Sequence, residues 1–405
     1  MATVSGPGLS ANRARKSATG TRRPTSAFAL VATLAAQLLL APALASAGPA
    51  PASTVRPFHV RSSDGTSVKG IAESPEAVPS AAVVMVPGTG AFDRDVKFAN
   101  SGTPRDLLFK DLAARLNARG LATVRYDRRG VVYGKVGEAA LDPAESATLT
   151  VASQRDDLRA VYDWTRSPQG LRARCVILFG HSEGLRHIAG LAESGAPPPL
   201  LVIGVGAPMR SPVEVMRWQM AERAVSALRL MDSDGNGEIT QLEMGANWHR
   251  TPASGFFRFD GANQPRKNLT EADLQRIGTW QLTSYRRERT AALALDDAAP
   301  FPDAKAPVGR ASWWKSWFTD GRPIADRLAA WPSPTILHYG EIDSQVLPQA
   351  EIAAARAALG ARVTVRLHPA RGHALGENGL LGPMDESIAD QIADEIAAAA
   401  RGCPA

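Results

Sequence analysis

The amino-acid sequence predicts an α/β fold, with a mostly parallel β-sheet covered by helices on both faces and a mainly helical insertion. Short apolar segments alternate with amphipathic segments of helical period, which is typical of parallel strands buried between helical layers. The alternation stops near Ala207 and resumes at Thr335. Residues 207–331, which contain seven of the eight tryptophans, differ in composition from the rest. We therefore expect two core parts, residues 58–206 and 332–400, and a helical cap over residues 207–331.

The spacing of apolar residues along the two core parts predicts the individual elements. The run AVVMV at 82–86 is continuously apolar, which indicates a strand buried on both faces. Thr103 and Pro104 indicate a helix start, because threonine is a good N-cap and proline fits the first helical position. In chain order we expect strands at 59–61, 67–72, 82–86, 121–126, 176–179, 200–205, 335–339 and 363–367, and helices from 103 to 120, from 151 to 165, after residue 184, from 349 to 359 and from 385 to 399.

The net charge of +6 does not indicate a nucleic-acid partner. Five of the basic side chains lie in the first 47 residues, which contain no acidic residue, so the remainder holds 41 basic and 40 acidic side chains. No basic patch with interleaved aromatic residues occurs in that remainder. We therefore expect no binding to nucleic acid.

Residues 1–47 have the pattern of a signal peptide. A basic stretch precedes the uncharged apolar segment Ala27–Ala45, and the motifs Ala43-Leu44-Ala45 and Ala45-Ser46-Ala47 each offer a cleavage site. An uncleaved membrane anchor is the alternative, but Pro42 and the small residues that follow favour cleavage. We expect export to the periplasm or the medium, with no stable membrane span after cleavage.

The chain has two cysteines, Cys175 in a predicted core strand and Cys403 in the tail. A cysteine in such a strand behaves as a small buried apolar residue. We therefore expect no structural disulfide and no metal site built from cysteines.

The segment Gly180-His181-Ser182-Glu183-Gly184 fits the G-x-S-x-G nucleophile elbow. An apolar strand precedes it and a helix-like segment follows it. In this context two glycines let a serine occupy a strained turn, with its hydroxyl exposed at the carboxyl end of the sheet. Ser182 is therefore the candidate nucleophile.

A serine nucleophile needs a base and a carboxylate that orients the base. In this kind of sheet the chain order is serine, acid and histidine, with each partner in a loop after a strand. Asp343 and His373 both follow predicted strands downstream of Ser182, so they are the candidate acid and base. Glu341 is the alternative acid and His368 the alternative base.

Negative charge on the attacked oxygen needs two backbone N–H donors. One is expected from Glu183, the residue after the nucleophile. The other is expected from Pro87-Gly88-Thr89-Gly90, the loop after the strand at 82–86, where glycines let the backbone approach closely. Thr89 is the preferred donor and Gly90 the alternative.

Four motifs together resemble the α/β-hydrolase superfamily, and most closely its bacterial serine esterases with a G-S-G-x-x-D-R-D oxyanion loop and a G-H-S-E-G-G elbow. They are VVMVPGTGAFDRD (83–95), VRYDRRGV (124–131), GHSEG (180–184) and GEID (340–343). The resemblance covers about residues 58–206 and 333–400 but not the cap.

The resemblance implies an α/β-hydrolase fold and hydrolysis of a small-molecule ester by Ser182, Asp343 and His373. Two positions depart from the family pattern: Thr89 replaces a serine, and Leu185 replaces a second glycine after the elbow. A serine peptidase or an acyltransferase on the same triad is an alternative. A non-catalytic, calcium-dependent binding protein is the alternative from a different class.

Residues 232–243, within the cap, fit every position of an EF-hand calcium loop. Oxygen ligands occupy positions 1, 3 and 5, glycine gives the sharp turn at position 6, and a bidentate carboxylate closes the loop at position 12. The segment 259–273 resembles a degenerate second hand without inner acidic groups, so we expect one calcium ion. The expected ligands are Asp232, Asp234, Asn236, the carbonyl of Glu238, Thr240 through water, and Glu243.

Overall fold

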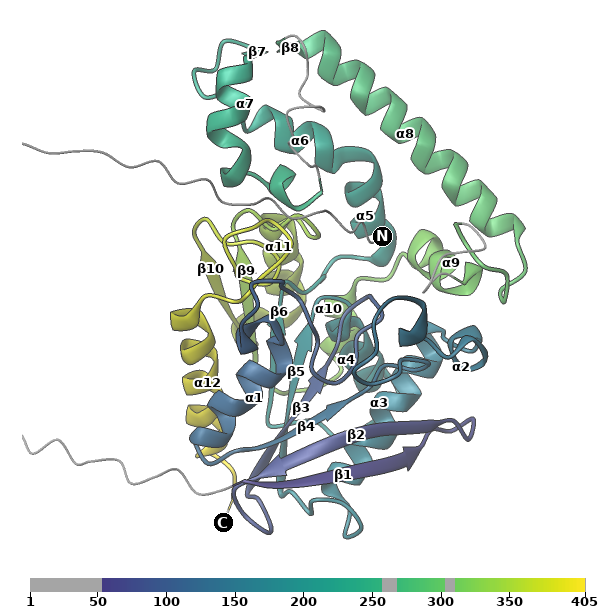
Figure 1. Cartoon of the computed structure of the whole chain (residues 1–405), viewed down its shortest axis with the longest axis vertical. Helices are drawn as coiled ribbons and strands as arrows, with labels where there is room; N and C mark the ends of the chain where they lie inside the picture. The colour runs from purple at the N-terminus through teal and green to yellow at the C-terminus, as the bar shows by residue number, and fades with distance from the viewer. Residues whose placement is uncertain (1–52, 257–267, 303–309, 405) are drawn as a thin grey trace, which may run out of the picture. The chain divides into compact units, whose positions relative to one another are not determined.

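The computed structural model describes residues 53–256, 268–302 and 310–404, so the predicted signal peptide lies outside the described residues. Eight strands form one sheet in the order β1-β2-β4-β3-β5-β6-β9-β10 (Figure 1). β2 pairs antiparallel with β1 and β4, and the remaining neighbours are parallel. The strands are β1 Thr54–Arg61, β2 Ser67–Ser74, β3 Ala81–Val86, β4 Ala122–Tyr126, β5 Cys175–His181, β6 Leu201–Val205, β9 Thr335–Gly340 and β10 Val363–His368.

Helices cover both faces of this sheet because alternate residues of a strand point to opposite faces. One face of β3 packs with α3 and α4, and the other packs with α1 and α12, through Val84, Leu158 and Ile188 on the first side and Val83, Leu112 and Ile392 on the second. The core helices are α1 Leu108–Ala118, α2 Pro143–Ala147, α3 Val151–Arg166, α4 Gly184–Glu193, α11 Pro348–Leu359 and α12 Glu386–Ala400.

This strand order with helices on both faces is the α/β-hydrolase fold, so the predicted fold class is confirmed. The predicted start of the first helix is wrong. Pro104–Asp106 forms a separate 3₁₀ turn, Thr103 makes no side-chain cap, and α1 begins only at Leu108.

The segment between β6 and β9 is mainly helical among its described residues. It has a small apolar core of its own, built from Ala227, Leu228, Met231, Ile239, Met244, Ala253 and Leu274. A two-stranded ribbon, β7 Glu238–Ile239 and β8 Leu269–Thr270, lies beside this core. The helices are α5 Pro212–Arg217, a π-turn Trp218–Glu222, α6 Arg223–Arg229, α7 Gln241–Asn247, α8 Glu271–Ala294, α9 Ala311–Thr319 and α10 Ile324–Leu328, of which α10 packs against α4 and α11 of the core.

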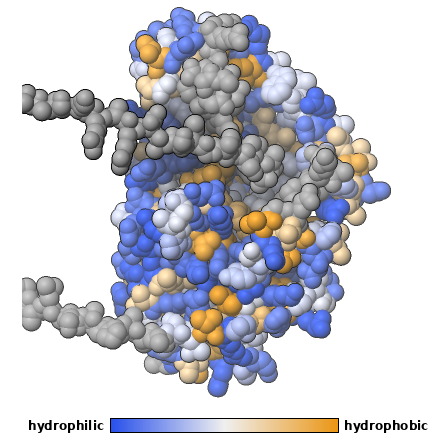
Figure 2. All heavy atoms as spheres, viewed as in Figure 1, coloured by the Kyte–Doolittle hydropathy of each residue, from blue (hydrophilic) through white to orange (hydrophobic). Residues whose placement is uncertain are grey.

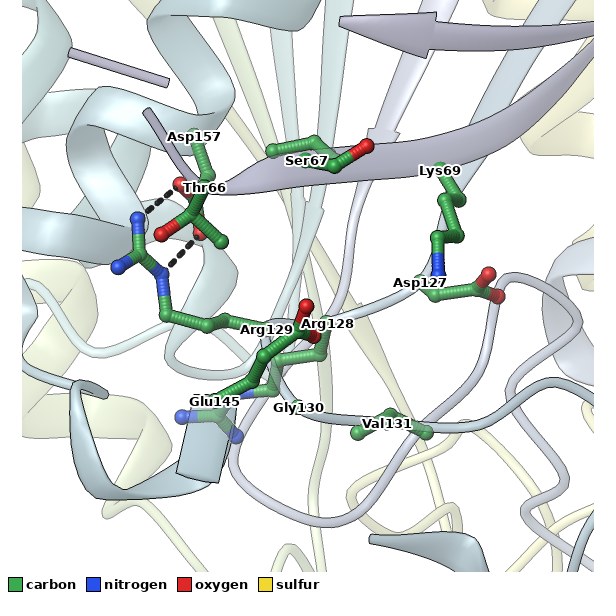
Figure 3. A pocket seen from close by; sticks show the side chains of 11 residues that line it. Thr66, Ser67, Lys69, Asp127, Arg128, Arg129, Gly130, Val131, Glu145 and Asp157 are labelled. Atoms are coloured by element: carbon green, nitrogen blue, oxygen red, sulfur yellow. Dashed lines mark hydrogen bonds and ion pairs between the residues drawn. The ribbon is translucent and has the colours of Figure 1, made fainter. Parts of the chain in front are cut away.

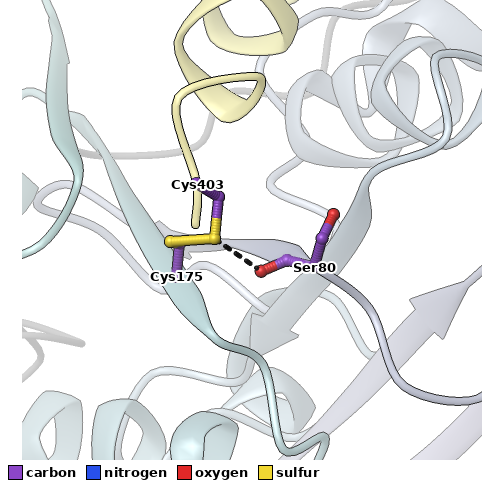
Figure 4. Close-up of a disulfide and its surroundings, with 3 residues drawn as sticks. All are labelled: Ser80, Cys175 and Cys403. Atoms are coloured by element: carbon purple, nitrogen blue, oxygen red, sulfur yellow. Dashed lines mark hydrogen bonds between the residues drawn. A yellow bond between two sulfur atoms is a disulfide. The ribbon is translucent and has the colours of Figure 1, made fainter. Parts of the chain in front are cut away.

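The two cysteines form a disulfide, so our expectation of none is wrong (Figure 4). Cys175 is the first residue of β5 and only half-buried, and the tail after α12 returns to that end of the strand. The Cys403 sulfur also lies 3.2 Å from the Ser80 carbonyl oxygen. A local sequence pattern could not reveal this pairing because the two cysteines are 228 residues apart.

Figure 2 shows a mostly hydrophilic face on which hydrophobic residues lie in small separate groups. The central strands of the sheet are buried, with all six residues of β3 and all five of β6 inaccessible, whereas the edge strands β1 and β10 are largely exposed or half-buried. None of the described helices combines the length and the apolarity that crossing a membrane requires.

Candidate active site

Ser182 lies in a tight turn between β5 and α4. It has a positive φ of 54°, a conformation that costs a non-glycine residue free energy and persists only where neighbours enforce it. The Ser182 N–H donates to the Val205 carbonyl at 2.9 Å. A Cβ atom at Gly184 would lie 2.2 Å from the Val86 carbonyl oxygen, so glycine is required there. The expected elbow geometry is therefore present.

Asp343 and His373 lie together at the carboxyl ends of β9 and β10. The Nδ1 atom of His373 is 2.9 and 3.0 Å from the two Asp343 carboxylate oxygens, and both side chains are buried. Asp343 Oδ1 also accepts backbone N–H bonds from Gln345 at 2.6 Å and Val346 at 3.1 Å. These bonds fix the carboxylate, which in turn fixes the imidazole.

The two alternative residues lie elsewhere. Glu341 accepts a hydrogen bond from the Ala370 N–H at 3.0 Å, at an exposed position. His368 contacts His338, with 3.1 Å between ring nitrogens. Burial, followed by the charge of His338, lowers the pKa of His368 to about 4. Neither residue contacts the Asp343–His373 pair in the described structure.

His373 lies next to the elbow. Its ring centroid is 5.0 Å from that of His181. A Cβ atom at Gly206, directly after the carbonyl that binds Ser182, would lie 2.7 Å from His373 Nδ1. Ser182 Oγ makes no hydrogen bond within the described part of the chain. Such catalytic contacts are often long before substrate binds.

The loop after β3 also reaches the nucleophile. A Cβ atom at Gly88 would lie 2.8 Å from the Ser182 Cβ, so only glycine permits this approach. The backbone N–H groups of Thr89 and Glu183 donate to no acceptor within the described residues. The two amides named as oxyanion donors are thus uncommitted and close to Ser182 in the fold.

Sequence reasoning assigned no role to the side chains of Glu183, Arg128 and Trp313, which form a buried cluster beside the elbow. Thr89 Oγ1 and Arg128 Nη2 donate to Glu183 Oε2 at 2.8 and 3.0 Å, and Trp313 Nε1 donates to Oε1 at 2.7 Å. The V-R-Y-D-R-R-G motif contains Arg128, but nothing in the sequence relates it to residue 183.

The neighbouring residues of that motif brace the turn after β4. Arg129 binds the Asp157 carboxylate in the polar pocket drawn in Figure 3. Asp127 accepts from the Arg94 side chain and from the Arg94 N–H. This pocket includes none of Ser182, Asp343 and His373, so we interpret it as structural.

The cap contacts the loop that carries Asp343. Gln219, in the π-turn, donates to the Gln345 carbonyl at 2.6 Å, and Arg223 donates to the Ser344 carbonyl at 2.6 Å. Burial lowers the pKa of Arg223 to about 10, against the opposing attraction of Asp343. The acid loop is therefore held from the cap side.

The cap also contacts the loop that carries His373, through the 3₁₀ turn Pro252–Gly255. Ser254 Oγ accepts the Gly379 N–H at 2.9 Å. The Gly379 carbonyl accepts the N–H groups of His373 at 3.0 Å and of Ser344 at 2.8 Å. Gly379 therefore joins the cap, the acid loop and the histidine loop.

The predicted calcium loop brings its carboxylates together. One ligand atom from each of Asp232, Asp234 and Glu243 lies within 4.8 Å of the others. Asp232 Oδ1 is buried and has no hydrogen-bond partner among the described residues, which leaves it available to a cation. Asn236 Oδ1 accepts the Glu238 N–H at 2.7 Å. The donor set of oxygens suits calcium.

Strand β7, which lies within this loop, pairs with β8, the short strand directly before α8. Glu238 pairs with Thr270 and Ile239 pairs with Leu269 in antiparallel register. Residues 257–267 of the predicted second hand lie outside the described residues.

No family model matches the chain, and no curated protein matches its sequence. Solved structures do match the chain. The esterase domain of a Rhodothermus marinus protein is 14% identical, with a TM-score of 0.42, and the match covers 86% of this chain and 98% of that one. An esterase from Pyrococcus furiosus is 10% identical, with a TM-score of 0.46, covering 86% and 91%. An α/β hydrolase from a Penicillium species is 14% identical, with a TM-score of 0.46, covering 86% and 99%. A shared fold does not determine the reaction, which has to be inferred from the site.

Proposed function

We propose that the protein is an exported serine hydrolase that cleaves carboxylic esters. The observation that carries the proposal is the pair of contacts between His373 Nδ1 and the Asp343 carboxylate. These contacts lie at the carboxyl ends of the strands, where Ser182 occupies its strained turn. With a proton on Nδ1 shared with Asp343, Nε2 of His373 can accept a proton.

In the proposed reaction Ser182 Oγ attacks the ester carbonyl while His373 Nε2 takes the hydroxyl proton. The N–H groups of Thr89 and Glu183 stabilise the negative oxygen of the tetrahedral intermediate. His373 then gives its proton to the leaving alcohol, and the acyl group remains on Ser182. Water, deprotonated by His373, releases the acid and restores the enzyme.

The test is hydrolysis of p-nitrophenyl esters of graded chain length by the mature protein, beside Ser182→Ala. We expect turnover by the unaltered protein, and a loss of about 10⁴-fold or more in kcat for the variant. Turnover that survives in Ser182→Ala would refute the mechanism. Cleavage of peptides without cleavage of esters would favour the peptidase, and acyl transfer to an added alcohol without net hydrolysis would favour the acyltransferase.

We also propose that the loop at 232–243 binds one calcium ion that braces the cap. Asp232, Asp234 and Glu243 would supply carboxylate oxygens, with Asn236 and the Glu238 carbonyl completing the set. A bound ion would supply charge neutralisation and a cross-link between α6 and α7. Calcium outside the cytosol is abundant and steady, which favours structural support over signalling.

Calcium should stabilise the folded protein by about 2.7 kcal/mol when its free concentration is a hundred times Kd. Titration calorimetry and thermal melting, with and without a chelator, measure binding and stability directly. Glu243→Gln should weaken both, whereas Glu222→Gln, an exposed cap carboxylate outside the loop, should not. Equal melting temperatures with calcium and with chelator would contradict the proposal.

A further inference from the structure

The side chain of Glu183 lies at the centre of a buried hydrogen-bonded cluster, although the proposed mechanism uses only its backbone N–H. One carboxylate oxygen accepts from Thr89 Oγ1 and Arg128 Nη2, and the other accepts from Trp313 Nε1. Thr89 belongs to the loop after β3, Arg128 to the turn after β4, and Trp313 to α9. A single carboxylate thus connects three parts of the chain at the nucleophile.

Glu183 and Arg128 form an ion pair with both partners at most 3% exposed. Burial raises the pKa of Glu183, but its interactions with Arg128, then with His187 and Arg186, and the hydrogen bond from Thr89 outweigh burial and lower that pKa to about 2. The carboxylate is therefore charged at neutral pH. Removing either member would leave an uncompensated buried charge, which is strongly destabilising.

Arg128 orients the backbone of the oxyanion loop. Its Nη1 donates to the Gly88 carbonyl at 2.8 Å and to the Gly90 carbonyl at 3.1 Å. In a trans peptide the C=O and the following N–H point in opposite directions. Fixing the Gly88 carbonyl on Arg128 therefore aims the Thr89 N–H away from Arg128.

The Thr89 side chain adds a second restraint on the same residue. Its hydroxyl donates to Glu183, the residue that supplies the other oxyanion N–H. The two amides are thus tied to each other through one hydrogen bond between their own residues. Without it, the hydrogen bonds to residues 88–90 within the described part of the chain would come from Arg128 alone.

Helix α9 of the cap is fixed to the elbow helix independently of this cluster. Arg186, on α4, donates to the Ser316 side chain and carbonyl and to Asp320, and its guanidinium lies 4.5 Å from the Trp317 ring centroid. These contacts hold α9 so that Trp313 Nε1 reaches Glu183. Cap docking and oxyanion-loop geometry therefore share one carboxylate.

We propose that the Glu183 carboxylate is a positioning group for the oxyanion hole, set by Thr89 Oγ1 from the loop and by Trp313 Nε1 from the cap. The inference rests on the proposed function for the role of the two amides. It makes Trp313, a cap residue, a determinant of the reaction rate. Substrate affinity should depend little on Trp313. The restraint orients N–H groups that stabilise negative charge, and this charge develops only in the transition state.

Replacement of Glu183 itself would disrupt folding, so the test uses Thr89 and Trp313. Thr89→Val removes the hydroxyl with little change of shape, and Thr89→Ser keeps it. Trp313→Phe removes only the indole N–H and part of the ring. Trp314→Phe is the matched control, since its Nε1 donates to the Phe301 carbonyl within the cap.

Two readouts are measured on each variant: kcat and KM for a p-nitrophenyl ester, and the rate at which a fluorophosphonate probe modifies Ser182, read by mass spectrometry. We expect Thr89→Val to lower kcat and the phosphonylation rate about tenfold, with KM within about twofold. The variant keeps the oxyanion N–H and only loosens its orientation, so the loss should be smaller than the roughly 10²–10³-fold cost of losing an oxyanion donor. Thr89→Ser should recover most of that loss. Trp313→Phe should lower both rates about fivefold, and Trp314→Phe should leave both unchanged.

Equal losses in Thr89→Val and Thr89→Ser, a change confined to KM, or equal effects of Trp313→Phe and Trp314→Phe would overturn the positioning role. The phosphonylation rate separates this inference from the proposed function. If the protein hydrolyses no ester but is labelled at Ser182, the proposed function is wrong. The phosphonylation rates of the variants would then still test the positioning role of Glu183. No labelling of Ser182 in the unaltered protein would refute a working oxyanion hole, and both proposals with it.

Discussion

The α/β core and the cap contribute to the candidate site in different ways. From the core come Ser182, Asp343 and His373, each in a loop at the carboxyl end of a strand, so that the sheet alone brings them together. The cap supplies Trp313 and Ser254, which contact Glu183 and Gly379 rather than the triad itself. The candidate reactive groups thus lie where parallel strands end and are held by core residues such as Gln345 and Arg128, whereas the cap adds further contacts to the loops around them.

The largest expected effect lies in the core. Asp343→Asn keeps the shape of the acid but removes the charge that fixes the His373 tautomer, so kcat should fall by about 10⁴-fold with little change in KM. Steady-state kinetics measures this loss. Glu341→Gln is the matched control and should retain activity, because the Glu341 carboxylate accepts from the Ala370 N–H and contacts neither Asp343 nor His373 within the described residues. Equal losses in both variants would contradict the assignment of the acid.

Loss of the disulfide should lower the stability of the core without changing the catalytic rate. Replacing Cys175 and Cys403 by serine should lower the free energy of unfolding by about 2–4 kcal/mol, since the bond closes a long loop. The Cys175 end of β5 is opposite to the end that carries Ser182, so kcat should not change. Denaturant unfolding and ester kinetics measure the two quantities. A parallel loss of kcat would show that the two ends of the sheet are coupled.

A buried histidine on α4, the helix after the elbow, predicts that the folded protein loses stability in acid. Burial lowers the pKa of His187 to about 4, against the attraction of Glu183. Below pH 6.5 the unfolded chain binds a proton that the folded chain binds only near pH 4. Stability from this group is therefore complete above about pH 6.5 and lost as the pH falls through 4, by about 3 kcal/mol in total.

Denaturant unfolding at pH 7, 5.5 and 4 measures this loss in the unaltered protein and in His187→Leu. The variant should lose less stability on acidification. His59→Leu, at an exposed position of β1, should keep the original pH dependence. An unchanged pH dependence in His187→Leu would exclude this histidine as the cause.

The smallest expected effect concerns the cap. Ser254→Ala leaves the Gly379 N–H without its partner, so the free energy of unfolding should fall by about 1 kcal/mol. Because Gly379 also binds the backbone of His373, kcat should fall about threefold, as for a loss of less than 1 kcal/mol in the transition state. Ser226→Ala, exposed on α6, is the control. A stability loss with unchanged kcat would limit the cap to structural support.

The candidate triad and the calcium-loop candidate could be named from the sequence, whereas the contacts between the cap and the core could not. Ser182, Asp343 and His373 each follow an apolar strand in a fixed order, and the loop at 232–243 is contiguous, so local patterns are enough to select them as candidates. Apolar spacing tells which face of an element is buried, but it does not tell which element covers that face. Contacts that join distant residues were therefore missed.

Three such contacts illustrate the limit. Arg128 and Glu183 are 55 residues apart, Trp313 and Glu183 are 130 apart, and the cysteines are 228 apart. In each case the chain returns through the folded sheet or cap, and no short-range pattern records the pairing. The predicted start of α1 failed for a different reason, because Pro104 begins a 3₁₀ turn that ends before the helix begins.

The central claim is that Ser182 carries the acyl group during turnover, and rapid-quench kinetics with a p-nitrophenyl ester tests it most directly. We predict a burst of about one p-nitrophenol per protein molecule when deacylation is slow. Mass spectrometry of the quenched protein should then locate the acyl group on the peptide that contains Ser182. Ester turnover with the acyl group on another residue, or with no acyl-protein under conditions that give a burst, would contradict the claim.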